Sequence, residues 1–295
     1  MPLEPRLLDV QCITSAGLHR MAYAEWGDPA NSRVLVAVHG LSRVGRDFDN
    51  FARAFCDEYR VVCPDVVGRG RSDWLKNPML YQYPTYVSDM VTLLARLNAK
   101  TVHWFGTSMG GLIGMGIASL DSNPIERLIL NDVGPVVRVE ALRRIAEYFG
   151  RPIRFASIDE AIQYIRTVSA PFGPHSDAEW RYLTEIVLRR DGEGWVLHYD
   201  PRIAEPFRAD MAANPGRGDM LLWDVYDKIR CPTLAVRGAL SDLLSPQDHE
   251  EMGKRGPKAT LATIEGVGHA PTFMHADQIA VARRFLASDE LQTHG

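Results

Sequence analysis

The chain has 295 residues, of which 46% are hydrophobic and 24% charged, and its formal net charge is -4. This length fits one large α/β domain or a domain with a lid, and it allows a sizeable core. The charges are interspersed, so they give no electrostatic argument for a nucleic-acid partner or an anionic membrane surface. No uninterrupted apolar run approaches the length that spans a bilayer.

The cysteines and the first residues bear on the compartment. Cys12, Cys56, Cys63 and Cys231 are scattered and have no C-x-x-C spacing, which is typical of reduced thiols in a cytoplasmic protein. The start, MPLEPRLLDVQC, lacks the basic and apolar parts of a signal peptide. We therefore expect a cytoplasmic protein.

The first third of the chain alternates strands with helices. Residues 7–14 and 18–25 alternate in polarity around a Ser-Ala-Gly turn and predict an antiparallel hairpin. Residues 33–38 (RVLVAV) are continuously apolar, as in a strand buried on both faces, and they run directly into His39-Gly40-Leu41. A helix over 47–55 and a buried strand over 59–63 follow.

The next loop, residues 68–74, reads GRGRSDW. Its Arg69 and Arg71 are either anion ligands or partners of Asp65 or Asp73, and we favour pairing within the loop. Residues 83–97 then predict a helix with Pro84 in its first turn.

Residues 102–116 (VHWFGTSMGGLIGMG) have the pattern of a strand that turns sharply into a helix with a serine at the turn. This is the setting of a nucleophile elbow, in which the serine hydroxyl projects above the sheet. We expect Ser108 to have a strained backbone with positive φ. Gly106 and Gly110 have no side chain to collide with the strand or the helix.

After a strand over 125–132, the chain changes character. Residues 136–225 have a helical pattern rich in arginine, acidic residues and aromatics, with capping boxes at Ser157/Glu160 and Ser176/Glu179. We expect an all-helical insertion. The sheet pattern resumes with a strand over 233–237, and the loop that follows carries Asp242.

The C-terminal part predicts a helix from Pro246, a last strand over 260–264 and an amphipathic helix over 277–287. Gly268-His269-Ala270 lies in the loop after the last strand. Ser108, Asp242 and His269 thus each follow an apolar strand. Because loops at the carboxyl ends of parallel strands converge, these side chains are expected to meet.

Five motifs together resemble the α/β-hydrolase fold family over nearly the whole chain: His39-Gly40, the GRGRSDW run, the elbow, Ser241-Asp242 and Gly268-His269-Ala270. The resemblance implies an α/β fold with a mostly parallel central sheet, helices on both faces and an inserted helical cap. It implies a core of residues 1–135 and 226–295, and a cap of residues 136–225 that roofs the active site. Many members have histidine where this chain has Arg69.

The chain order Ser108, Asp242, His269 matches the order of the catalytic triad in this fold. Ser108 would be the nucleophile, His269 the base and Asp242 the carboxylate that orients the imidazole. His275 is the rival base, at the start of a helix. Asp132 is the rival acid, because some family members place the acid after that strand.

Acyl transfer also needs two backbone N–H groups directed at the carbonyl oxygen, which form the oxyanion hole. One comes from Met109, the residue after the nucleophile, and the resemblance implies that the other comes from Leu41. We interpret His39 as a structural residue that holds this loop, because the catalytic histidine of the fold lies near the C-terminus. We expect neither a metal site nor a cofactor.

The function predicted is that of a serine carboxylesterase that forms an acyl-enzyme on a small-molecule ester. Serine at the elbow excludes dehalogenases and epoxide hydrolases, which need aspartate there. A carbon–carbon bond hydrolase or a lactonase would use the same triad. Ala270-Pro271 argues against the first, because those enzymes usually carry an aromatic residue directly after the catalytic histidine. A hydrolase-fold binding protein is the alternative without catalysis, and a homodimer is left open.

Overall fold

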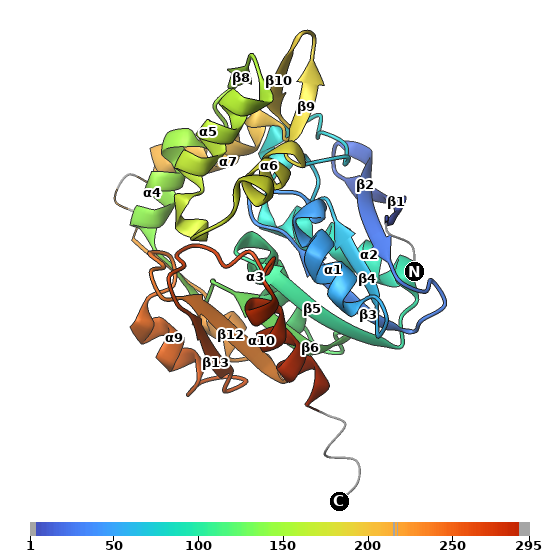
Figure 1. Cartoon of the computed structure of the whole chain (residues 1–295). Helices are drawn as coiled ribbons and strands as arrows, with labels where there is room; N and C mark the ends of the chain where they lie inside the picture. Colours follow the sequence, from blue (N-terminus) through green and yellow to red (C-terminus); the bar gives the residue numbers. More distant parts are fainter. Residues whose placement is uncertain (1–3, 215, 217, 289–295) are drawn as a thin grey trace, which may run out of the picture.

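A central sheet of eight strands organises the computed structural model, which describes residues 4–214, 216 and 218–288. In chain order the strands are β1 (Arg6–Thr14), β2 (Gly17–Trp26), β3 (Arg33–Val38), β4 (Arg60–Pro64), β5 (Thr101–Thr107), β6 (Ile125–Asn131), β12 (Thr233–Gly238) and β13 (Thr260–Ile264). Their order across the sheet is β1-β2-β4-β3-β5-β6-β12-β13 (Figure 1). β1, β2 and β4 pair antiparallel, and all later pairs are parallel. The predicted hairpin and mostly parallel sheet are confirmed.

Helices cover both faces of the sheet (Figure 1). One face carries α1 (Asp49–Phe55) and α10 (Ala276–Ala287), and the other carries α2 (Tyr83–Leu97) and α3 (Met109–Ala118). Two short 3-10 turns, η1 (Gly45–Phe48) and η2 (Pro78–Leu80), lie in the loops, and α9 (Pro246–Met252) follows β12.

Strand β5 illustrates why the parallel strands are apolar along their whole length. Successive side chains of a strand point to opposite faces, so Trp104 packs in the cluster below α2 and α3 while Phe105 faces α1. There the Phe105 ring lies 4.7 Å from the ring of Phe51. Both side chains are completely buried. A continuous apolar run is therefore the expected signature of a strand with a helix layer on each side.

The segment between β6 and β12 forms a separate layer beyond the carboxyl ends of the parallel strands (Figure 1). Its helices are α4 (Val139–Tyr148), α5 (Ile158–Val168), α6 (Asp177–Glu185), α7 (Ala204–Ala213) and α8 (Trp223–Tyr226), with 3-10 turns η3 (Ala170–Phe172) and η4 (Pro201–Ile203). The Ser176 side chain and Glu179 form the predicted capping box at the start of α6. Ser157 caps α5, but Glu160 there bonds the N–H of Ala156.

The expectation that this segment is all-helical is wrong. It contains an antiparallel sheet of β8 (Arg154–Phe155), β10 (Gly194–Leu197) and β9 (Leu188–Asp191), and a short pair of β7 (Val136–Val137) with β11 (Met220–Leu221). The two-residue turn Gly192-Glu193 joins β9 to β10, and Gly192 has φ of 56°. A glycine directly after a short strand at such a turn is a hairpin signal, because the turn needs positive φ there.

Several contacts join this layer to the loops after β3 and β4. Arg43 donates to the carbonyl of Leu183 in α6 at 2.9 Å, and the N–H of Gly70 donates to the carbonyl of His198 at 2.8 Å. The hydroxyl of Tyr81 donates to Asp200 at 2.9 Å. The layer is therefore held directly above the loops in which the candidate site residues lie. Among the helices of the described residues, none is long and apolar enough to cross a membrane.

Candidate active site

Ser108 lies at the turn between β5 and α3, with φ of 52° and ψ of -116°. This is the strained, positive-φ conformation expected of a nucleophile elbow. The flanking glycines explain how the turn closes. A β carbon at Gly106 would lie 2.3 Å from the carbonyl oxygen of Gly110, and one at Gly110 would lie 2.1 Å from that of Val38. No side chain fits at either position.

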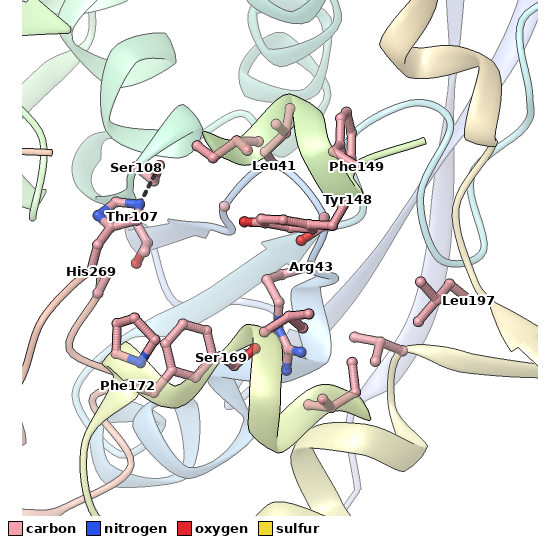
Figure 2. A pocket seen from close by; sticks show the side chains of 18 of the residues that line it. Leu41, Arg43, Thr107, Ser108, Tyr148, Phe149, Ser169, Phe172, Leu197 and His269 are labelled. Carbon is pink, nitrogen blue, oxygen red and sulfur yellow. Dashed lines mark hydrogen bonds between the residues drawn. The ribbon is translucent and has the colours of Figure 1, made fainter. Parts of the chain in front are cut away.

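The imidazole of His269 contacts the serine hydroxyl. Its Nε2 lies 3.0 Å from Oγ of Ser108, and its Nδ1 lies 2.7 Å from Oδ2 of Asp132 (Figure 2 draws the contact with Ser108). Since a carboxylate only accepts, Nδ1–H donates to Asp132 and leaves Nε2 free to accept the hydroxyl proton. This tautomer is the one that a general base toward Ser108 requires.

Asp132 follows β6 and is fully buried, with φ of 55°. Besides the imidazole, it accepts hydrogen bonds from the N–H of Gly238 at 2.7 Å and from the hydroxyl of Ser241 at 2.6 Å. Three donors thus surround this one carboxylate. A buried carboxylate needs such donors to remain ionised.

The prediction that Asp242 orients His269 is wrong. In the loop after β12, the hydroxyl of Ser241 donates to Asp132, while the side chain of Asp242 is directed away from Asp132 and His269. The Asp242 side chain is 52% exposed and pairs with Arg144 of α4 at 2.8 Å. The rival acid, Asp132, takes the position beside the imidazole.

The rival base, His275, lies elsewhere. It is the N-cap residue of α10, and its Nε2 lies 3.1 Å from Oε1 of Glu179 in α6. Its ring is 4.9 Å from that of His175. His275 therefore contributes to the contact between α6 and the C-terminal loop, and not to the surroundings of Ser108.

The residues expected to form the oxyanion hole flank the serine. Met109 is the first residue of α3, so its N–H has no carbonyl one turn earlier in the helix to bond. Leu41 follows Gly40, and a β carbon at Gly40 would lie 3.7 Å from Cβ of Ser108. The backbone of the loop after β3 therefore passes directly beside the nucleophile.

His39 has the structural role expected for it. It is fully buried, its Nδ1–H donates to the carbonyl of Gly40 at 2.7 Å, and its Nε2 accepts from the N–H of Val66 at 3.0 Å. Burial lowers the pKa of this imidazole to about 3, and the nearby Arg69 and Arg43 act in the same direction. The neutral ring therefore fixes the loop that carries Leu41.

Arg69 is a residue whose role the sequence did not reveal. The expected pairing with Asp65 or Asp73 is wrong for this side chain, which is fully buried. Its guanidinium donates to the carbonyls of Leu41 and Val67 at 3.0 and 2.8 Å, to the hydroxyl of Tyr86 at 3.0 Å, and to Sδ of Met109 at 3.6 Å. In the described chain none of these acceptors is a carboxylate. Arg69 thus ties together the two residues expected to stabilise the oxyanion.

A cavity of about 110 Å³ opens beside Ser108 and His269. Core loops provide Gly40 to Arg43 and Thr107. The layer above provides residues of α4, α5, η3, β10 and the loops beside them, including Arg144, Tyr148, Tyr164, Ser169 and Phe172. Figure 2 shows Tyr148, Ser169 and Phe172 around this cavity. A second, apolar cavity of about 560 Å³ lies between α2, α3, α4 and α7. Leu41, Ile145 and Phe149 line both cavities and form the wall between them.

One cluster in the described residues has the composition of a metal site. Cys12, His19 and Asp89 each offer a ligand atom, and these atoms lie within 4.8 Å of one another between β1, β2 and α2. The imidazole already contacts Asp89 at 3.0 Å, and burial together with Asp89 raises the pKa of the Cys12 thiol to about 12. The contact between His19 and Asp89 accounts for two of these three groups without an ion. The cluster also lies on the hairpin, apart from Ser108.

Comparison with known proteins identifies the family. The model of the alpha/beta hydrolase family matches residues 35–283. The chain belongs to the alpha/beta hydrolase family. Within it, the chain is 53% identical over 289 residues to a 3-hydroxybutyrate-oligomer hydrolase of Cupriavidus necator, covering 97% of this chain and 99% of the relative.

Two further members show lower identity to this chain. Esterase YbfF of Escherichia coli is 25% identical, with 87% of this chain and 94% of that protein covered. The crystal structure of an alpha/beta hydrolase from Novosphingobium aromaticivorans matches with a TM-score of 0.83 and 33% identity, covering 96% of this chain and 98% of that one. This alpha/beta hydrolase is a carboxylic ester hydrolase, and the predicted enzyme class is confirmed.

Proposed function

We propose that this alpha/beta hydrolase cleaves esters through an acyl-enzyme on Ser108, with His269 as general base and acid and Asp132 as the orienting carboxylate. The observation that carries the proposal is the unbroken hydrogen-bonded chain from Ser108 through His269 to a buried Asp132. Ser108 and His269 both line the cavity between the core loops and the layer above.

The reaction has two halves. His269 takes the proton of Ser108 as Oγ attacks the ester carbonyl, and it returns the proton to the alkoxide as the carbon–oxygen bond breaks and the alcohol leaves. Water then attacks the acyl-enzyme with the same imidazole as base. Asp132 keeps Nδ1 protonated in both halves and stabilises the imidazolium between them.

The negative charge on the carbonyl oxygen is stabilised, in this proposal, by the N–H groups of Leu41 and Met109. Their position beside Ser108 and the bonds that Arg69 makes to both residues support the assignment. Rigid donors at that point are effective because they need no reorientation during the reaction. The steps use only groups of the protein and water, without a metal or cofactor.

Residues 136–225 are proposed to act as a cap on a core of residues 1–135 and 226–295. Support comes from the cavity, whose walls combine core loops with α4, α5 and η3. We also propose a cytoplasmic location, which the four free thiols support.

The substrate class proposed is a short oligomeric ester of a 3-hydroxy acid. The relative at 53% identity is a 3-hydroxybutyrate-oligomer hydrolase and is similar over almost its entire length. The cavity offers hydroxyl groups and cations as well as apolar walls, through Ser169, Tyr148, Arg43 and Arg144. Such a lining suits an ester that carries oxygen at regular intervals along its backbone better than it suits a plain alkyl chain.

The test is the release of 3-hydroxybutyrate from its linear dimer and trimer by the purified protein. Wild type should release it and should be labelled by a fluorophosphonate, whereas Ser108→Ala should do neither while remaining folded. Equal labelling of the two proteins would remove Ser108 from its role. A parallel panel of p-nitrophenyl butyrate, a lactone and a dienoate diketone tests the competing reactions, and a preference for the diketone would support carbon–carbon bond hydrolysis instead.

A further inference from the structure

We propose that Arg144 binds the free carboxylate of the substrate, on the leaving-group side of the scissile ester. This inference rests on the proposed function, because it assigns the recognition of one end of an oligomeric hydroxy-acid ester. Arg144 lies on α4 and lines the cavity that contains Ser108 and His269.

Arg144 and His269 line the same cavity, and a chain of contacts through the loop after β12 links them. The Arg144 guanidinium pairs with Asp242, and the preceding residue, Ser241, bonds Asp132, which in turn bonds His269. Because His269 must protonate the leaving alkoxide, the alcohol portion of the ester lies beside this imidazole. In a 3-hydroxybutyrate unit, a single methylene separates the alcohol carbon from the carboxylate, so the negative charge enters close to the guanidinium.

The guanidinium has donors to offer. Nη2 is the atom that contacts both oxygens of Asp242, at 3.0 and 2.8 Å, whereas Nη1 makes no hydrogen bond within the described residues. The partner carboxylate is 52% exposed and the arginine side chain 38% exposed, so the pair is weakly held. A substrate carboxylate can therefore compete with Asp242 or share the guanidinium with it.

Arg43, the other cation of the cavity, differs in this respect. Asp47 holds it with two hydrogen bonds, at 2.8 and 2.6 Å, and it also donates to the carbonyl of Leu183. Its side chain is 9% exposed, and its charge is compensated within the protein. The bonds of Arg43 join the loop after β3 to α6. Of these two arginines, Arg144 is therefore the one available to bind an incoming anion.

The experiment compares two substrates that differ only in charge: the linear 3-hydroxybutyrate dimer and its C-terminal primary amide. Steady-state kinetics are measured for wild type, Arg144→Gln, Arg144→Lys and Arg143→Gln. Arg143 is the neighbouring arginine on α4, 48% exposed, and it lies 3.9 Å from Glu140. It serves as the matched control.

We expect Arg144→Gln to reduce the preference for the acid over the amide about tenfold, mainly through KM of the acid. Arg144→Lys should recover part of that preference, and Arg143→Gln should leave it unchanged. Asp242→Asn should act in the opposite direction and lower KM for the acid, because it removes the competing carboxylate. If the Arg144–Asp242 pair only stabilised the cap, Arg144→Gln and Asp242→Asn would change KM for the acid in the same direction.

Two outcomes overturn the inference: an equal loss on both substrates in Arg144→Gln, or a rise in KM for the acid in Asp242→Asn. Neither affects the proposed function if wild type still cleaves the amide and p-nitrophenyl butyrate in a Ser108-dependent manner. Failure of wild type on all these esters would instead reject the proposed function itself.

Discussion

The loops after β6 and β12 each present an aspartate beside the same active site, yet the two carboxylates have opposite surroundings. Asp132 is fully buried and accepts hydrogen bonds from Gly238, Ser241 and His269. Asp242 is half exposed and contacts only an arginine of the layer above, among the residues described. The loop after β12 thus supplies donors to the orienting acid and not the acid itself.

The comparison shows what selects an orienting carboxylate. A buried acid keeps its charge only where the fold provides enough donors, and a neighbouring strand can provide them. β12 pairs with β6 in parallel, so the start of its loop lies beside the end of β6. Gly238 and Ser241 therefore reach Asp132, whereas Asp242 faces outward.

Replacement of each aspartate by asparagine gives the most direct test of this contrast. Asp132→Asn should lower turnover about ten-thousandfold, because the amide favours the wrong imidazole tautomer, as in a serine protease triad. Asp242→Asn should change the turnover of a neutral ester less than about threefold, since its side chain has no contact with His269. The measurement is kcat on p-nitrophenyl butyrate at one pH.

Folded fractions are matched by circular dichroism before the two rates are compared. The opposite ranking, with Asp242→Asn the more damaging, would restore Asp242 as the acid and leave Ser108 and His269 unaffected.

The same contrast explains which parts of the site were predictable. Ser108 and His269 lie in glycine-flanked motifs, because the local backbone geometry requires glycine there. The apolar strands before them can also be recognised in the sequence. The choice between Asp132 and Asp242 depends on which neighbouring loop turns inward, and no local pattern encodes that. The contacts of Arg69 likewise come from three separate segments of the chain.

The short strands of the layer above were missed for another reason. The strongest local signals in this segment are the helix caps at Ser157 and Ser176, which predict helices, whereas the β9–β10 hairpin is marked only by the glycine turn at Gly192. Strands of two to four residues also carry too few alternations to produce a period. Only the turn residues could have revealed the β9–β10 hairpin.

His39 is a buried base, in contrast to the buried acid Asp132. Its folded-state pKa is about 3, lowered by burial, whereas the unfolded chain has an ordinary histidine pKa near 6.5. Below that value the unfolded chain binds a proton that the folded protein does not, so stability is complete above about pH 6.5 and is lost as the pH falls. Between pH 7 and pH 5 the loss due to His39 should be about 2 kcal/mol.

The measurement is the free energy of unfolding in urea at pH 7 and pH 5, for wild type and His39→Gln. Asp65, whose pKa burial raises to about 6, acts in the opposite direction between about pH 4 and 6, because the folded protein then holds the extra proton. Asp65 is present in both proteins, so its contribution cancels when the pH dependence of His39→Gln is subtracted from that of wild type. Identical pH dependence in the two proteins would show that His39 does not titrate on unfolding.

Ser241→Ala tests whether the loop after β12 acts through Asp132. The loss of one hydrogen bond to a buried carboxylate should reduce kcat about tenfold with little change in KM, and Ser241→Thr should restore most of it. Ser245→Ala is the control in the same loop, since Ser245 caps α9 and bonds Asp248. If KM alone changed, or if both alanine variants were equally impaired, Ser241 would have only a structural role in the loop and would not act through Asp132.

The smallest effect expected is that of the exposed pair on stability. A double-mutant cycle with Arg144→Gln and Asp242→Asn should give a coupling energy below about 1 kcal/mol, because water and salt screen two half-exposed side chains. Added salt should reduce it further. The cycle is measured by urea unfolding in the absence of substrate. A coupling above about 2 kcal/mol would mean that the pair fastens α4 to the loop after β12, and the guanidinium would then be held as firmly as that of Arg43. A weak coupling instead leaves Arg144 able to exchange Asp242 for an anionic ligand without loosening the fold.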